Sequence, residues 1–289
     1  MSPNQVKSAI GHAGRVRRLV VSLAVVAVAG CSATTPPPPE PSPTSTDNTT
    51  TTPPPLPPPA WTVGATPLPL RPDGFGQVLP TPPELVNRSL PTTDLLTPPA
   101  DGKYSSTVSA VPDDVLARST WRANCPVTPS ELRYLTMSFH GYDGRVHTGE
   151  MIVNAQLADD VTKVFGWLFD ADYPIEEMRV VAAAELDAAP TGDGNNTTAF
   201  VCRNKVGRNS WSAHAFGQAI DVNPFCNPYT TGDLVLPELA SSYVDRSVPR
   251  PGMIMPGDAV VRAFAAIGWK WGGEWSDPVD IQHFSSTGT

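Results

Sequence analysis

Basic residues are scarce in this sequence once its first thirty residues are set aside. The chain of 289 residues has 20 lysines and arginines against 28 aspartates and glutamates. Residues 1–30 hold four of the basic residues and none of the acidic ones, so residues 31–289 carry 16 positive and 28 negative charges, or −12. A protein that binds the phosphate backbone needs a basic surface, and this imbalance excludes nucleic acid as the expected partner.

The sequence also lacks two motifs that carry catalysis or metal binding in other proteins. No Gly-x-Ser-x-Gly segment is present, so we do not expect a serine nucleophile on a strand-to-helix elbow. The four cysteines include no Cys-x-x-Cys pair, which argues against zinc held by thiolates.

The apolar run near the N-terminus is too short to cross a membrane. It extends over eleven residues, from Leu19 to Ala29, whereas a spanning helix needs about 20. Four basic residues precede it and Ala29-Gly30-Cys31 follows, a pattern typical of a secretory signal that ends at a bacterial lipobox. We therefore expect a signal peptide over 1–30, with Cys31 lipidated and holding the protein at the outer face of the cytoplasmic membrane. An ordinary cleaved signal with a chance cysteine is the alternative.

Composition divides the rest of the chain into three parts. Residues 32–60 contain twelve prolines, which exclude a helix or a central strand and predict a disordered, extended stalk over 31–66 that reaches into the cell wall. Residues 67–128 still contain many prolines but also large apolar side chains, so we expect an irregular, partly ordered arm. Residues 129–289 should form the globular domain.

Hydrophobic periodicity in this last part predicts an α+β fold, in which helices flank a small antiparallel sheet. Alternation at Leu135, Met137 and Phe139 indicates a strand, and Met151–Val153 a second one. Apolar positions from Leu157 to Leu168 indicate a helix that Asn154 caps. Further strands are expected at Met178–Ala183, at Ala219–Val222 and after Trp269, with a helix over 260–267 between the last two. The tryptophans near the site could stack on muropeptide sugars, but aromatic residues near a strand usually pack in the core, which we expect for Trp211, Trp269, Trp271 and Trp275.

Cysteine chemistry adds one expected crosslink. Cys31 is the lipid site, which leaves three thiols in an oxidising compartment. We favour a disulfide between Cys125 and Cys202, which would join the arm to the domain, and Cys226 is the competing partner.

Two polar clusters in the C-terminal half can together hold a metal ion. The first contains His214 and Asp221, with Gly217 between them to permit a sharp turn, and the second ends at His283. Two histidines and one carboxylate are the ligands of a catalytic zinc that keeps a fourth position for water. Asp280 is the expected general base, and Glu274 is its rival.

The segment Ser212-Ala213-His214-Ala215-Phe216-Gly217-Gln218-Ala219-Ile220-Asp221 resembles the SxHxxGxAxD motif of VanY-like zinc D-alanyl-D-alanine carboxypeptidases and L-alanyl-D-glutamate endopeptidases. Asp280-Ile281-Gln282-His283-Phe284 resembles the closing D-x-x-H-F element of the family. The resemblance implies zinc on His214, Asp221 and His283, with Asp280 as base. It also implies that Arg203 binds the substrate carboxylate or the polarised carbonyl, and we place Ser212 beside it as a substrate-binding or ligand-orienting residue.

The expected activity is therefore hydrolysis of peptidoglycan stem peptides. The family resemblance favours a D-Ala-D-Ala carboxypeptidase, yet many of these carry Glu where this chain has Asp280, as many of the endopeptidases do. An endopeptidase that cuts the L-Ala-D-Glu bond, or a catalytically idle lipoprotein that binds the cell wall, stays open.

Overall fold

The computed structural model describes residues 61–289, which belong to one compact unit. The expected signal peptide, the lipid site at Cys31 and almost all of the proline-rich stalk lie outside these residues. Within 61–289, no helix has the length and the apolar composition that a membrane crossing requires.

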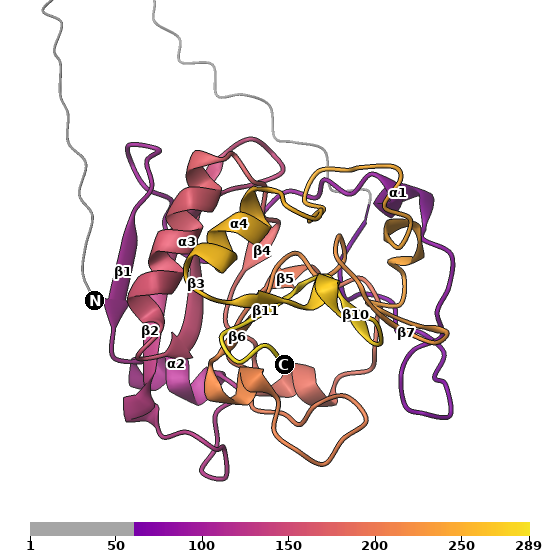
Figure 1. The fold of residues 1–289 in the computed structure, drawn as a ribbon, viewed down its shortest axis with the longest axis horizontal. Coiled ribbons are helices and arrows are strands. Elements are labelled where there is room, and N and C mark those ends of the chain that lie inside the picture. The colour runs from indigo at the N-terminus through magenta and orange to yellow at the C-terminus, as the bar shows by residue number, and fades with distance from the viewer. Residues whose placement is uncertain (1–60) are drawn as a thin grey trace, which may run out of the picture. The chain divides into compact units, whose positions relative to one another are not determined.

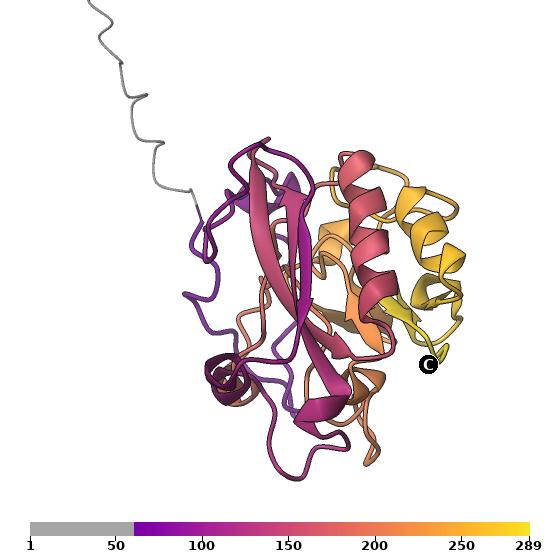
Figure 2. The same ribbon diagram turned by 90° about the vertical axis from the view of Figure 1, so that its left-hand side faces the viewer.

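The largest sheet lies at one side of the unit and is covered by helices. It has the strand order β1-β2-β3, with β2 (Leu132–His140) paired antiparallel to both neighbours, β1 (Ser106–Ser109) and β3 (Val146–Asn154). Figure 2 shows helix α3 (Ala158–Asp170) between this sheet and helix α4 (Ala259–Ala266). The predicted fold of helices with small antiparallel strands is confirmed.

Helix α3 forms because its apolar residues recur on one face. Val161, Val164, Phe165 and Leu168 are buried in the core that α3 shares with alternate residues of β2. Asp159 and Asp160 lie in the first turn, where negative charge is favourable next to the positive end of the helix dipole. The helix begins later than predicted, and the cap assigned to Asn154 is wrong. Asn154 is the last residue of β3, and Leu157 occupies the N-cap position.

The remaining strands are short and form separate ladders rather than the single sheet predicted. In the described part of the chain these are two antiparallel ladders and one parallel pair. The first ladder has the order β6 (Ala219–Asp221), β11 (His283–Ser285), β9 (Lys270–Trp271). The second has the order β10 (Val279–Asp280), β7 (Tyr229–Thr231), β8 (Leu234–Leu236). The parallel pair consists of β4 (Glu177–Met178) and β5 (Asn196–Thr197). Figure 1 shows β6 and β11 side by side near the middle of the unit.

The strand predicted over Met178–Ala183 is wrong beyond its first residue. The Asn196 side chain occupies the backbone groups of Arg179, because its Oδ1 accepts from the Arg179 N–H at 2.9 Å and its Nδ2 donates to the Arg179 carbonyl at 3.0 Å. Glu185 accepts a hydrogen bond from the backbone N–H of Ala182 at 2.6 Å, and a short 3₁₀ helix follows over Ala183–Asp187. These side chains take the backbone groups that a continued strand would use.

The segment 67–128 is more regular than its prolines predict. It contains β1 and two short helices, α1 (Pro83–Val86) and α2 (Asp113–Arg118). Cys125 is joined to Cys202 by a disulfide with Cα atoms 5.9 Å apart, the pairing favoured from the sequence. Cys226 is buried and unpaired within the described residues, with its Sγ 3.3 Å from the Tyr142 hydroxyl.

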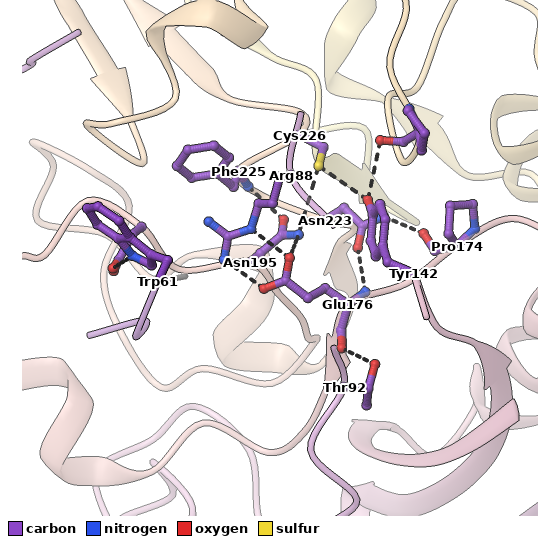
Figure 3. A network of polar contacts seen from close by, with 12 residues as sticks. Trp61, Arg88, Thr92, Tyr142, Pro174, Glu176, Asn195, Asn223, Phe225 and Cys226 are labelled. Carbon is purple, nitrogen blue, oxygen red and sulfur yellow. Dashed lines mark hydrogen bonds and ion pairs between the residues drawn. The ribbon is translucent and has the colours of Figure 1, made fainter. Parts of the chain in front are cut away.

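A buried ion pair attaches the beginning of the arm to the domain. The Arg88 guanidinium donates to both carboxylate oxygens of Glu176, at 2.6 and 2.7 Å, and lies over the Phe225 ring at 4.4 Å. Asn195 connects the pair to the domain, because its side-chain amide donates to Glu176 and accepts from the Phe225 backbone N–H (Figure 3). Only 1% of Arg88 and 6% of Glu176 is exposed, so each charge depends on the other for its neutralisation.

We expect Arg88→Met to lower the free energy of unfolding by about 3–5 kcal/mol, because the substitution leaves the Glu176 carboxylate buried without its counter-ion. Urea denaturation followed by circular dichroism measures the change. Arg71→Met is the matched control on the same arm. It removes an ion pair with Asp233, which is 86% exposed, so its loss should be far smaller. Equal losses in the two variants would contradict the structural role of Arg88.

Candidate metal centre

His214 is fixed in position by two backbone contacts. It lies in the 3₁₀ helix Ala213–Phe216, whose N-cap is Ser212, and the Ser212 hydroxyl accepts a hydrogen bond from the His214 backbone N–H at 3.3 Å. Its Nδ1 is 2.6 Å from the Ala199 carbonyl oxygen. A carbonyl only accepts, so Nδ1 carries the proton and Nε2 presents a lone pair to the site. Ser212 thus orients a ligand and also lines the cleft described below.

Gly217 reverses the chain between His214 and Asp221. It adopts the left-handed conformation with φ of 63°, which costs a residue with a side chain more than it costs glycine. A Cβ at this position would also lie 2.5 Å from the backbone nitrogen of Asn154. Both constraints require glycine here, and the turn leads directly into β6 with Asp221 at its end.

Asp221 and His283 meet because they are cross-strand partners in the ladder of β6 and β11. Their neighbours Ile220 and Phe284 are also paired and point to the opposite face, where both are fully buried. Phe284 stacks on Phe264 of α4 with ring centroids 4.1 Å apart. The two ligand positions are therefore held by the hydrophobic core beneath them.

The three side chains converge on one small volume. Asp221 Oδ1 lies 3.0 Å from His283 Nδ1 and 3.2 Å from His214 Nε2, and the two ring nitrogens are 3.2 Å apart. Zinc bonds of about 2.0–2.1 Å at tetrahedral angles place ligand atoms roughly 3.3 Å from one another. The donor set and its spacing therefore fit a zinc ion with three protein ligands.

The surroundings of Asp221 favour its ionised form. Burial opposes ionisation, but the imidazole groups of His214 and His283 beside the carboxylate outweigh it and lower the pKa of Asp221 far below its ordinary value. A carboxylate that stays ionised is the form that binds a divalent cation.

Asp280 lies beside the cluster at the end of β10. Burial, together with the charge of Asp221, raises the pKa of Asp280 to about 7, while His283 and Arg203 oppose this shift. Its Oδ1 is buried and has no hydrogen-bond partner among the described residues. By contrast, the rival Glu274 lies in the 3₁₀ helix Gly272–Glu274, where it is exposed and does not line the cleft.

The cluster opens into a cleft of ≈ 900 Å³. Arg203 and Asp280 line it together with the three ligand residues. The cleft also contains Trp275 and three residues that the sequence did not single out: Lys205, Arg208 and Tyr229. The expectation of core packing is wrong for Trp275, which is half-buried in the cleft wall with its ring centroid 5.4 Å from that of His283. The sequence feature that could have indicated this position is the short separation of eight residues between Trp275 and His283.

A buried His-Asp-His cluster with a neighbouring carboxylate in an open cleft defines a candidate hydrolytic metal centre. Residues 206–286 match the family model described as D-alanyl-D-alanine carboxypeptidase. The match supports the resemblance to VanY-like peptidases that the motifs of this segment carry. The match includes His214, Asp221, Asp280 and His283 but begins after Arg203. Searches of curated proteins and of solved structures found no match.

Proposed function

We propose that the protein is a zinc-dependent peptidase of peptidoglycan that removes the terminal residue from stem peptides ending in D-alanyl-D-alanine. The observation that carries this proposal is the convergence of His214, Asp221 and His283 in one cleft with Asp280, within the segment that matches the carboxypeptidase family. An idle wall-binding protein has no physical need for a base beside its metal ligands.

Each residue of the site has a separate task. His214, Asp221 and His283 would hold the zinc, which when bound would supply Lewis acidity and make water a stronger acid. The Asp280 carboxylate takes the proton of the attacking water and passes it to the leaving amine. Arg203, whose charge already acts on Asp280, binds the terminal carboxylate of the substrate or its polarised carbonyl. Ser212 helps to fix the orientation of His214, because its hydroxyl accepts a hydrogen bond from the His214 backbone N–H.

The proposed place of action is the cell wall. We propose that Cys31 carries a lipid that holds the protein at the outer face of the cytoplasmic membrane, and that the proline-rich segment up to residue 66 extends the domain toward its substrate. The excess of acidic residues agrees with a partner other than nucleic acid.

Mass spectrometry of digested muropeptides tests the function. We expect the zinc-loaded protein to release one terminal D-alanine from pentapeptide stems and to leave the rest of the stem intact. Scission between L-alanine and D-glutamate would instead assign it to the endopeptidases, the second candidate that an aspartate at position 280 favours. Intact muropeptides at every pH, despite full zinc occupancy, would contradict both activities and favour the idle wall-binding protein.

A further inference from the structure

One wall of the cleft is a basic hairpin, which we define as residues 203–212. The stem is closed by the backbone bridge between Asn204 and Trp211 and by the hydrogen bond from the Ser212 N–H to the Arg203 carbonyl, at 3.1 Å. The tip is a tight turn. The Lys205 backbone N–H donates to the Ser210 carbonyl oxygen at 2.9 Å, and Gly207 has φ of 64°.

The hairpin is attached firmly to the metal centre. Cys202 immediately before it is held by the disulfide to Cys125, and its backbone N–H donates to the Thr120 hydroxyl at 2.9 Å. Ser212 at its other end is the cap that orients His214. Side chains on the hairpin therefore keep a defined position relative to the ligands.

Three cations of the hairpin line the same cleft as the ligands: Arg203, Lys205 and Arg208. The charge of Arg203 reaches Asp280, and the charge of Arg208 reaches Tyr229 of β7, the cross-strand partner of Asp280, where it opposes the rise in pKa that burial causes. Lys205 and Arg208 thus add two positive charges to the cleft lining besides that of Arg203.

These three cations form no ion pair with any carboxylate in the described part of the chain. Four acidic side chains share the cleft. Asp221 belongs to the candidate metal cluster, Asp280 lies beside it, and the other two have hydrogen-bond partners of their own. Glu238 is buried and accepts from the Gly76 backbone N–H at 2.8 Å, and Asp277 accepts from the Thr231 hydroxyl at 2.8 Å. Lys205 and Arg208 therefore line the cleft without an ion-pair partner among the described residues, although carboxylates line other parts of the same cleft.

We propose that Lys205 and Arg208 form a second anion subsite, which selects acidic peptides, meaning substrates that carry a carboxylate in addition to the one bound at Arg203. This inference rests on the proposed peptidase function and names the substrate class of that site. The terminal carboxylate of a peptide substrate pairs with only one of the three cations, Arg203 near Asp280. An additional carboxylate on an earlier residue of the peptide, such as the free α-carboxylate of a γ-linked D-glutamyl residue, satisfies the cations farther along the hairpin.

Two peptides that differ in one group test the subsite. Both end in D-alanyl-D-alanine and contain one γ-linked D-glutamyl residue, whose α-carboxyl group is free in one peptide and a carboxamide in the other. We expect the zinc-loaded protein to cut the acidic peptide with kcat/KM about 10-fold higher, mainly through KM, and to lose most of this preference at 0.5 M salt. In Lys205→Gln/Arg208→Gln the two peptides should be cut with similar kcat/KM.

The matched control is Lys103→Gln/Arg122→Gln, which removes the same charges from exposed positions outside the cleft and should keep the preference. Equal cleavage of both peptides by the unmodified protein, or a preference that survives the hairpin substitutions, would overturn the subsite and leave the peptidase function standing. If neither peptide is cut, the peptidase function fails, and calorimetric binding of the same pair decides the subsite. Tighter binding of the acidic peptide that the hairpin substitutions abolish supports it, and equal binding overturns it.

Discussion

Asp280→Asn should lower kcat by about 10²–10⁴ while the protein still binds one equivalent of zinc. Asparagine keeps the size of the side chain but cannot accept the proton of the attacking water, and general-base catalysis contributes about this factor. The position supports the role, because the carboxylate lies in the cleft with the ligands and one of its oxygens is buried without a partner among the described residues. Hydrolysis of a D-alanyl-D-alanine peptide and metal analysis of the same sample measure the two effects.

The matched control for this substitution is Glu274→Gln. Glu274 is the rival base in the sequence, but it is exposed and does not line the cleft, so its replacement should change kcat less than two-fold. A large loss in Glu274→Gln together with an active Asp280→Asn would exchange the two roles. A loss of zinc in Asp280→Asn would show that Asp280 is a ligand instead of a base.

His283→Ala should abolish stoichiometric zinc binding and hydrolysis together. The substitution removes one of three ligand atoms that lie 3.0–3.2 Å from one another, and the two that remain cannot complete a catalytic zinc site. Because zinc binds the folded state, a chelator should lower the midpoint of thermal unfolding of the unmodified protein and leave that of His283→Ala almost unchanged. Metal analysis and calorimetry measure these effects.

His140→Gln is the matched control for the loss of a histidine. His140 lies at the end of β2 near the exposed Asp172 and belongs to no candidate metal site among the described residues. This variant should keep one equivalent of zinc and its activity. Full zinc occupancy in His283→Ala would place the metal elsewhere and contradict the assignment.

The proximity of His214 and Asp221 could be predicted from the sequence because the two residues lie close together along the chain. His214, Gly217 and Asp221 lie within eight residues, and the turn at Gly217 is a property of glycine that the spacing already indicates. Helices α3 and α4 could be predicted because their apolar periods are strong, whereas the short α1 and α2 could not. The pairing of His283 with Asp221 could not, since the register of β11 on β6 depends on Ile220 and Phe284 packing against α4, a contact between distant parts of the chain.

Other features depend on contacts that no local pattern records. The pairing of β1 with β2 places part of the arm in the main sheet, although prolines surround this strand in the sequence. Arg88 looks like a surface residue until the structure places it against Glu176. The basic hairpin is a loop whose cations gain significance only because the fold directs them into the cleft.

Zinc titration of chelator-treated protein tests the central claim most directly, with hydrolysis of a D-alanyl-D-alanine peptide as the readout. The His214-Asp221-His283 centre predicts no cleavage at the start, a linear increase with added zinc and a break at one equivalent. Cleavage that persists without metal, or full zinc binding without cleavage, would contradict a zinc peptidase built on these three ligands.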